Sequence, residues 1–267
     1  MPPSPESLPV ALARRLATRA LGRVHEHHAI LDSTNERALS WALTGAVHGA
    51  MVTADAQSAG RGRLGREWSS PASDDLYVSL VVRPPWPRPP ADVLAALGLA
   101  VAVGLREGLA CWLPDLALKW PNDLLHQGRK LAGILCEARW QGEALSLVIG
   151  FGVNVSRRAF DPALAQATSL ALAGAKATRV DVLAAVLASL EGVLDRYLDP
   201  RDPGFAAIRE RYEPHCVTLE AQAPVLLRPP GGDAPVAAEV LGLDARGALR
   251  ARPIAGGPAF TVVSVEP

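Results

Sequence analysis

Gln57-Ser-Ala-Gly-Arg-Gly-Arg-Leu-Gly-Arg-Glu-Trp68 alternates three glycines with three arginines and ends in a tryptophan. Glycine loses more backbone entropy on ordering than other residues, so this run predicts a loop that is mobile when empty. Guanidinium groups bind carboxylates and phosphates, and a Gly-rich backbone brings N–H groups close to an anion. The Gly-Lys-Ser/Thr ending of a Walker loop is missing. A solvated linker or a nucleic-acid contact is the alternative interpretation of this run.

The composition favours a folded globular protein. The 267 residues are 49% hydrophobic and 20% charged, enough for one large domain or for one large and one small domain. The formal net charge is zero, which argues against a nucleic-acid-binding protein. Cys111, Cys136 and Cys216 have no metal-binding spacing and are expected to be buried free thiols. No signal peptide or membrane-spanning run is visible, so we expect a soluble, cytoplasmic protein.

The residues before the Gly/Arg loop predict a short helix, a strand and a second helix. The first helix is expected over Leu8 to Leu21. His25-Glu-His-His28 is interpreted as a strand rather than a metal site, because no second ligand cluster supports a metal. Asp32-Ser-Thr-Asn35 is typical of a helix start. Capping needs only one or two of these four polar side chains, so the others can face a ligand. A buried strand at Ala50 to Ala54 then leads into the loop.

The middle of the chain predicts a sheet with buried helices. Strands are expected over 76–83, 116–120, 129–140 and 145–155, and helices over 92–109, 182–197 and 205–212. The last two strands are expected to form a hairpin, and Gly150 and Gly152 within it indicate close approach of another group, for example a ligand, to the backbone. Lys119-Trp-Pro-Asn-Asp123 is a second dense cluster, with Asn122 and Asp123 expected on a turn.

The pattern changes to short strands and turns from residue 217 onward. Strands are expected over 217–227, 236–243, 248–253 and 260–265, forming a small all-β module of roughly 50 residues. We therefore expect a domain boundary near residue 214, with one domain over 1–214 and a second over 215–267.

The Gly/Arg loop, the Lys119–Asp123 cluster, Lys130 and the Gly-containing strand are expected to line one pocket. Its positive groups suit an acidic small molecule or a nucleotide phosphate, and Asn and Asp near phosphate suit Mg²⁺. No nucleophile elbow is present, so phosphoryl or nucleotidyl transfer by positioning and charge stabilisation is favoured over covalent hydrolysis. The residues alone do not name the substrate.

Four motifs in order carry a resemblance to a known family. They are Gly60-Arg-Gly-Arg-Leu-Gly-Arg-Glu-Trp68, Lys119-Trp-Pro-Asn-Asp-Leu124, Arg129-Lys-Leu-Ala-Gly-Ile-Leu135 and Gly150-Phe-Gly-Val-Asn154. Together with Asp32-Ser-Thr-Asn35 they resemble the biotin protein ligase family over about residues 30 to 250. The resemblance implies an α+β fold: a central catalytic domain with a mixed β-sheet flanked by helices, then a small C-terminal β-barrel.

The resemblance also implies a two-step, ATP-dependent reaction. Biotin and MgATP would give biotinyl-5′-AMP and pyrophosphate, and the adenylate would then acylate a lysine of the biotin carboxyl carrier protein of acetyl-CoA carboxylase. ATP and biotin are therefore the expected substrates, with Mg²⁺ as the metal ion. The loop from Gly60 to Trp68 is expected to order over the adenylate and shield it from water.

Site residues follow from the resemblance position by position. Arg61, Arg63 and Lys130 are the catalytic candidates. Biotin and the adenylate are expected to contact Ser33, Thr34, Asn35, Gln57, Gly60, Arg61, Gly62, Arg63, Arg66, Trp68, Lys130, Gly133 and Gly150. The nucleotide is expected to lie near Lys119, Asn122, Asp123 and Asn154, with Asp123 as the candidate metal ligand.

The sequence departs from the family pattern at two places, and other interpretations of the chain remain. Asp75 stands where the family usually has Asn, and Thr261-Val-Val-Ser-Val265 lacks the usual Gly-Glu of the last strand. Only 31 residues precede Asp32, too few for the family's winged helix, so we expect a monofunctional ligase that binds neither DNA nor a membrane. Pairing of sheet edges in the family suggests a homodimer. The rivals are a lipoate or octanoate ligase, a nucleic-acid-binding protein and a non-catalytic biotin sensor.

Overall fold

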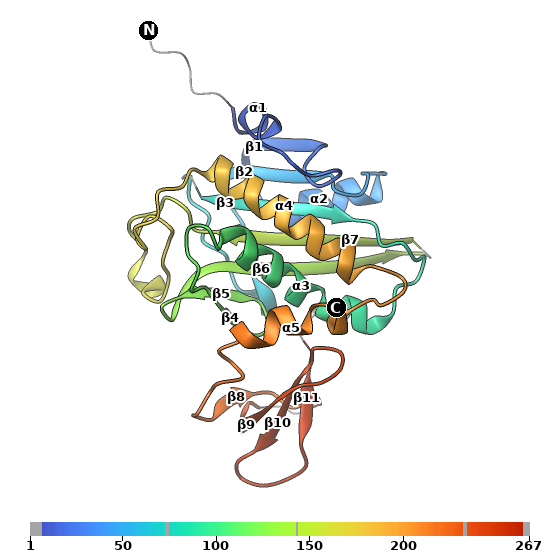
Figure 1. Ribbon diagram of the computed structural model, residues 1–267, viewed down its shortest axis with the longest axis vertical. Coiled ribbons are helices and arrows are strands. Elements are labelled where there is room, and N and C mark those ends of the chain that lie inside the picture. Colours follow the sequence, from blue (N-terminus) through green and yellow to red (C-terminus); the bar gives the residue numbers. More distant parts are fainter. Residues whose placement is uncertain (1–6, 73–74, 143, 232–233, 264–267) are drawn as a thin grey trace.

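The computed structural model describes residues 7–72, 75–142, 144–231 and 234–263, and its larger sheet has seven strands (Figure 1). These are β1 (His25–Leu31), β2 (Met51–Gln57), β3 (Leu76–Val82), β4 (Ala117–Lys119), β5 (Asp123–His126), β6 (Arg129–Gln141) and β7 (Ala144–Val153). Their order is β1-β2-β3-β7-β6-β5-β4. β1 and β2 are parallel and the other neighbouring pairs are antiparallel, so the predicted mixed sheet is confirmed.

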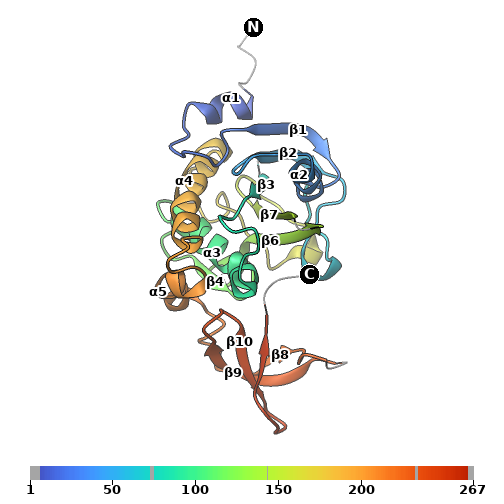
Figure 2. The same ribbon diagram turned by 90° about the vertical axis from the view of Figure 1, so that its right-hand side faces the viewer.

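Helices cover both faces of this sheet. The helices are α1 (Leu8–Ala13), α2 (Thr34–Leu43), α3 (Ala91–Leu109), α4 (Arg179–Tyr197) and the short α5 (Arg209–Tyr212). Figure 2 shows α3 and α4 on one face of the sheet and α2 on the other. Successive strand side chains alternate between faces. Accordingly Met51 belongs to the large core under α3 and α4, whereas its neighbour Val52 belongs to the smaller core under α2.

The face under α2 is hollowed where small residues meet on three adjacent strands. Gly133 of β6 pairs with Gly152 of β7. Gly150 of β7 pairs with Leu135 of β6 on one side and with Ser79 of β3 on the other. These positions alternate along their strands with residues of the large core under α3 and α4. They therefore lie on the opposite face of the sheet, toward α2. The predicted hairpin of β6 and β7 is confirmed. It supplies most of the hollowed surface, which is called the floor of the site.

The first helix is shorter than predicted, and the backbone donors at the far end of the predicted range bond a carboxylate instead. α1 ends at Ala13 rather than continuing to Leu21. Glu191 of α4 accepts hydrogen bonds from the backbone N–H groups of Arg19, Ala20 and Leu21 at 2.7, 2.8 and 3.0 Å. These donors are thereby satisfied outside a helix, which a local sequence pattern cannot indicate.

The histidine-rich segment forms strand β1, as predicted. His25 Nε2 and His27 Nδ1 lie 2.7 and 2.8 Å from Thr53 Oγ1 on the neighbouring strand, and His28 Nε2 lies 3.0 Å from Glu26 Oε1. These histidines therefore have hydrogen-bonding roles in the sheet edge.

The turn predicted for Asp123 is wrong, since this residue begins β5. β5 and β6 form a hairpin whose turn residues Gln127 and Gly128 both have positive φ, 49° and 76°. Such a pair of left-handed residues is typical of a tight hairpin turn. The sequence of this short segment predicts no strand, because its four residues are too few to show an alternating pattern.

The C-terminal residues form a separate antiparallel sheet in the order β11-β10-β9-β8. Its strands are β8 (Val225–Leu227), β9 (Val236–Leu243), β10 (Leu249–Pro253) and β11 (Phe260–Val262). The predicted β-rich module is confirmed, but its described residues form an open sheet rather than a closed barrel, since the edge strands β8 and β11 are not paired with each other.

The boundaries of this module differ in part from expectation. The segment from Val217 to Glu220 is a turn rather than the start of a strand, with Glu220 N donating to Val217 O at 3.3 Å. The expected strand end at residues 264–265 lies outside the described residues. Trp120 Nε1 donates to Gly247 O at 3.2 Å, so the module contacts the main body. The division at residue 214 stays a prediction.

The cysteines only partly follow expectation. All three are free, and Cys216 is buried. Cys136 is only partly buried, and the desolvation of its thiol raises the pKa to about 12, which keeps it protonated at neutral pH. Cys111 is exposed in the turn after α3, so its predicted burial is wrong. Within the described ranges, no helix has the length and apolar character needed to cross a bilayer.

Candidate active site

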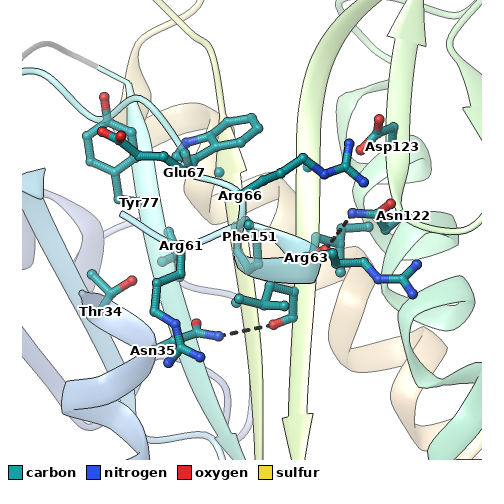
Figure 3. A pocket seen from close by; sticks show the side chains of 18 of the residues that line it. Thr34, Asn35, Arg61, Arg63, Arg66, Glu67, Tyr77, Asn122, Asp123 and Phe151 are labelled. Carbon is teal, nitrogen blue, oxygen red and sulfur yellow. Dashed lines mark hydrogen bonds between the residues drawn. The ribbon is translucent and has the colours of Figure 1, made fainter. Parts of the chain in front are cut away.

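One pocket of about 320 Å³ lies on the hollowed face of the sheet, within the range of small-ligand sites. Figure 3 shows side chains from the Gly/Arg loop, the start of α2 and the β5 side converging on it. The predicted site residues that line it are Ser33, Thr34, Asn35, Gln57, Arg61, Gly62, Arg63, Arg66, Trp68, Lys119, Asn122, Asp123, Lys130, Gly133 and Gly150. Residues that are distant in sequence are thus brought together as predicted.

The Gly/Arg loop folds back on itself over the pocket. Gly62 N donates to Arg66 O at 2.7 Å and Trp68 N donates to Gly60 O at 2.9 Å. Its tip is a turn in which Leu64 and Gly65 have φ values of 57° and 70°. The left-handed conformation favours glycine at Gly65. The loop is therefore a compact hairpin-like lid, defined here as residues 57–68.

The three arginines of the lid separate into two groups. In Figure 3, Arg61 extends toward Asn35, whereas Arg63 and Arg66 extend toward Asn122 and Asp123. Arg61 forms ion pairs with Glu36 and Glu137, the latter at 2.9 Å. The pocket therefore has one cationic group near α2 and a second near β5.

The start of α2 presents polar side chains that helix capping does not consume. Ser33 occupies the N-cap position, but its side chain makes no capping hydrogen bond. Thr34 N and Thr34 Oγ1 both donate to Gln57 Oε1, at 2.8 and 3.1 Å. Ser33, Thr34 and Asn35 are each at most 5% exposed. The expectation that some of these residues face the pocket agrees with this arrangement.

The glycines of the floor allow close approach of two side chains. A Cβ atom at Gly152 would lie 2.5 Å from Trp68 Cε2, and one at Gly133 would lie 2.7 Å from Trp68 Cζ3. At Gly150 an added Cβ would meet Asn35 Oδ1 at 2.0 Å. The predicted close approach to Gly150 and Gly152 is therefore confirmed, and the approaching groups belong to the protein itself. Among the described residues, no partner accepts a hydrogen bond from the buried Trp68 Nε1.

The second cluster supplies an ion pair at the opposite end of the pocket. Lys130 Nζ lies 2.7 Å from Asp123 Oδ1 and 5.3 Å from the centre of the Trp68 ring. Asn122 Nδ2 donates to Ile134 O of β6 at 3.0 Å, and this bond fixes the orientation of the Asn122 side chain. The described residues contain no group of three or more His, Cys, Asp or Glu side chains that could hold a metal ion alone.

Two predicted site residues do not line the pocket. Gly60 supports the base of the lid, where a Cβ would lie 2.3 Å from Trp68 O. Asn154 is buried, and its Nδ2 donates to Thr168 O at 2.9 Å. The backbone of Thr168 in turn bonds Lys130, with Thr168 N donating to Lys130 O at 2.8 Å. Asn154 thus supports the segment that holds Lys130.

Sequence reasoning missed several residues at or beside the pocket. Tyr77, Val78, Ile134, Leu135 and Phe151 line it without having been predicted, whereas Glu67, Trp120, Pro121 and Gly152 belong to the loop, cluster and strand that were expected to do so. Glu137 lies just beyond the lining and contacts Asn35 and Arg61. The signal that could have found Glu137 is the strand period of two, which places it on the same face as Gly133 and Leu135.

Comparison with known proteins agrees with this geometry. Residues 28–154 match the biotin/lipoate A/B protein ligase family. A biotin–[acetyl-CoA-carboxylase] ligase of Paracoccus denitrificans is 37% identical over 237 residues, covering 84% of this chain and 92% of that protein. The chain belongs to the biotin protein ligase family.

Further members of the biotin protein ligase family show the same relationship. The bifunctional ligase/repressor BirA of Bacillus subtilis is 35% identical over 212 residues, which cover 76% of this chain and 63% of that protein. This chain thus spans less than two thirds of the length of that relative. A biotin protein ligase from Aquifex aeolicus, solved in complex with biotin and ATP, superposes with a TM-score of 0.73. It is 27% identical, with 91% of this chain and 97% of that chain covered.

Proposed function

We propose that the protein is an ATP-dependent biotin protein ligase. Biotin and MgATP form biotinyl-5′-AMP and pyrophosphate, and the adenylate then biotinylates a lysine of a biotin carboxyl carrier protein with release of AMP. The observation that carries this proposal is a lid-covered pocket with hydrogen-bonding groups near α2 and cationic groups near β5. Membership of the biotin protein ligase family supports biotin as the carboxylic acid that is adenylated.

The polar residues at the start of α2 would bind one end of biotin. Thr34 and Gln57 already bond each other, so their positions are set before a ligand arrives. Preorganised polar groups reduce the ordering cost of binding. Ser33, Asn35 and the backbone at Gly133 and Gly150 complete this end of the proposed biotin site.

The cationic end of the pocket would stabilise the nucleotidyl transfer. Attack of a biotin carboxylate on the α-phosphate of ATP brings like charges together, and Arg63, Arg66 and Lys130 would offset that repulsion. Lys119 and Asn122 lie at the same end, beside Asp123. Arg61 also lines the pocket, but its guanidinium is paired with two carboxylates, so its catalytic role stays a prediction.

The donor set fits a magnesium ion that arrives with ATP. Mg²⁺ is usually held by one or two carboxylates together with substrate phosphates, rather than by an all-protein cage. Asp123 is the carboxylate that would hold it, and the ion would neutralise phosphate charge. Lys130, at 2.7 Å, would share Asp123 with the metal and keep its own cation near the phosphates.

The lid would protect the adenylate, which is a mixed anhydride sensitive to water. The hairpin hydrogen bonds of the lid and the packing of Trp68 on Gly133 and Gly152 close the pocket from above. The carrier protein as acceptor, a cytoplasmic location and a homodimer belong to this proposal as expectations.

Carrier biotinylation tests the proposed function. The protein is incubated with biotin, MgATP and a biotin carboxyl carrier domain, and the carrier mass is followed. We expect one biotinyl group on the acceptor lysine and none on a carrier whose acceptor lysine is replaced by arginine. Transfer to neither carrier, with the protein folded, would contradict the proposal. Arg63→Ala should slow the reaction by about a hundredfold to a thousandfold, as expected when one charge-stabilising donor is lost.

A further inference from the structure

Glu137 joins the floor of the pocket to the lid through one carboxylate. Its Oε2 accepts a hydrogen bond from Asn35 Nδ2 at 2.8 Å, and its Oε1 accepts one from Arg61 NH2 at 2.9 Å. The side chain is only 16% exposed. Since Asn35 lies at the start of α2 and Arg61 lies in the lid, this carboxylate bridges two elements that must act together when a ligand is enclosed.

The bridge continues as a hydrogen-bonded network beneath the pocket. Ser79 Oγ donates to Asn35 Oδ1 at 2.5 Å and lies 2.8 Å from Thr34 Oγ1. Gln57 accepts from Thr34, and Gln57 Nε2 donates to Ser70 Oγ at 2.8 Å. The network therefore begins at Arg61 in the first half of the lid and ends beside Trp68, whose carbonyl accepts from Ser70 Oγ at 2.9 Å.

Arg61 contacts a second carboxylate, that of Glu36, but the two contacts are not equivalent. Glu36 is 41% exposed and carries no hydrogen bond to the pocket floor among the described residues, whereas Glu137 is largely buried and bonded to Asn35. Water screens an exposed ion pair more than a buried one. Glu137 is therefore the carboxylate that links the position of Arg61 to that of Asn35 at the start of α2.

We propose that Glu137 is a positioning residue that couples ligand binding at Asn35 to closure of the lid. This inference rests on the proposed function. Acting through Arg61 and Asn35, Glu137 holds the lid over the pocket and thereby slows escape of the adenylate. Glu137 does not line the pocket, so it contributes to retention of ligand rather than to the charge stabilisation of the transfer step.

Glu137→Gln tests the coupling because it keeps the size of the side chain and removes its charge. The amide can still accept from Asn35 but loses the ionic contact with Arg61. We expect the KM for biotin and the rate of adenylate release to rise about tenfold or more, as for loss of a charge-assisted hydrogen bond. The kcat for adenylate formation should change much less. Trypsin should also cleave the ligand-free variant faster at Arg63 and Arg66.

Glu26→Gln is the matched control. Glu26 is a half-buried carboxylate bonded to Arg37 away from the pocket, and this variant should match the wild type in every measurement. If Glu137→Gln fails to fold, Glu137→Asp keeps the charge but shortens the side chain. It should show a smaller rise in KM and in adenylate release, again with little change in kcat. A KM, release rate and lid cleavage equal to those of the wild type would overturn the proposal. If the wild type forms no adenylate, the proposed function fails, while the trypsin comparison still tests the contact between Glu137 and the lid.

Discussion

The Lys130 ammonium group lies 2.7 Å from the Asp123 carboxylate, and the two side chains are 35% and 20% exposed. The pair faces the same pocket as Arg63 and Arg66. It places a cation and a candidate metal ligand side by side at the proposed phosphate end. This pairing explains why Lys130 is held in position before any nucleotide binds.

Replacing Lys130 by alanine should strongly impair adenylate formation. The change removes a cation from the phosphate end and leaves the Asp123 carboxylate facing phosphate without compensation. We expect a barrier increase of about 2–4 kcal/mol, measured as the single-turnover rate of biotinyl-adenylate formation. Lys176→Ala, at an exposed position, is the control and should behave as the wild type. Equal rates for the two variants would show that the phosphate end is misplaced.

Replacing Gly152 by alanine should displace Trp68 and weaken biotin binding. The added Cβ would lie 2.5 Å from Trp68 Cε2, closer than real contacts allow, so the ring and the lid must move. We expect the Kd for biotin to rise about tenfold or more, since the core of the site loses its packing. Titration calorimetry measures this change.

Gly98→Ala provides the comparison for the Gly152 variant. Gly98 lies in α3 with nothing within 4 Å of an added Cβ, so this change should leave biotin affinity unaltered and raise stability by up to about 1 kcal/mol. An unchanged biotin affinity in Gly152→Ala would rule out packing of Trp68 on this strand as a determinant of the site.

Asp75→Asn should destabilise the protein although asparagine is usual in the family. Asp75 Oδ1 accepts from Val155 N at 2.7 Å, and Asp75 Oδ2 accepts from Arg157 Nε at 2.8 Å. The Asp75 side chain is fully buried, and Arg157 is 10% exposed. Asparagine removes the charge that compensates Arg157, so we expect a loss of about 2 kcal/mol in the free energy of unfolding.

Urea denaturation measures the effect at Asp75. Asp202→Asn breaks an exposed ion pair with Arg196 and should cost less than about 1 kcal/mol. Similar losses in the two variants would contradict a special role for the buried pair. Asp75 is thus held by Arg157, which also donates to Tyr77 Oη at 3.0 Å.

The stability of the sheet edge should depend on pH through His25. Burial, followed by the nearby His27, lowers the pKa of His25 to about 4. The unfolded chain takes up a proton near pH 6.5, so it binds more protons than the folded protein between about pH 6.5 and pH 4. The free energy of unfolding should therefore fall by up to about 3 kcal/mol as the pH decreases through this window.

His25→Gln isolates this contribution. The stability of the wild type relative to the variant should decrease as the pH falls from 6.5 to 4, and it should be constant above pH 7.5. Denaturation curves at a series of pH values give this difference. A difference that does not vary with pH would exclude His25 as the source.

Local sequence signals predicted the elements and the positions of close approach. The Gly/Arg run predicted a loop, whose closure over the pocket was expected only from the family resemblance, and Gly150 and Gly152 predicted that another group approaches the strand. What approaches them could not be predicted, because Trp68 and Asn35 reach these glycines only through tertiary packing. The same limit applies to Glu137, whose two contacts depend on the register of β6 against the rest of the sheet.

The errors of the sequence analysis also have physical causes. The first helix does not reach Leu21, whose backbone N–H donates to Glu191, 170 residues away in the sequence. The turn at Val217 and the short strand β5 lie in segments too short to show a period. Trp120 was expected within the cluster that lines the pocket, yet its indole N–H also bonds the C-terminal module at Gly247, a contact that no local pattern contains.

The most direct test of the account is mass spectrometry of the purified protein with MgATP and, in turn, biotin, lipoate and octanoate. The account predicts biotinyl-adenylate with biotin and no adenylate with the other two acids. An adenylate of lipoate or octanoate, or none with biotin, would contradict the proposed function.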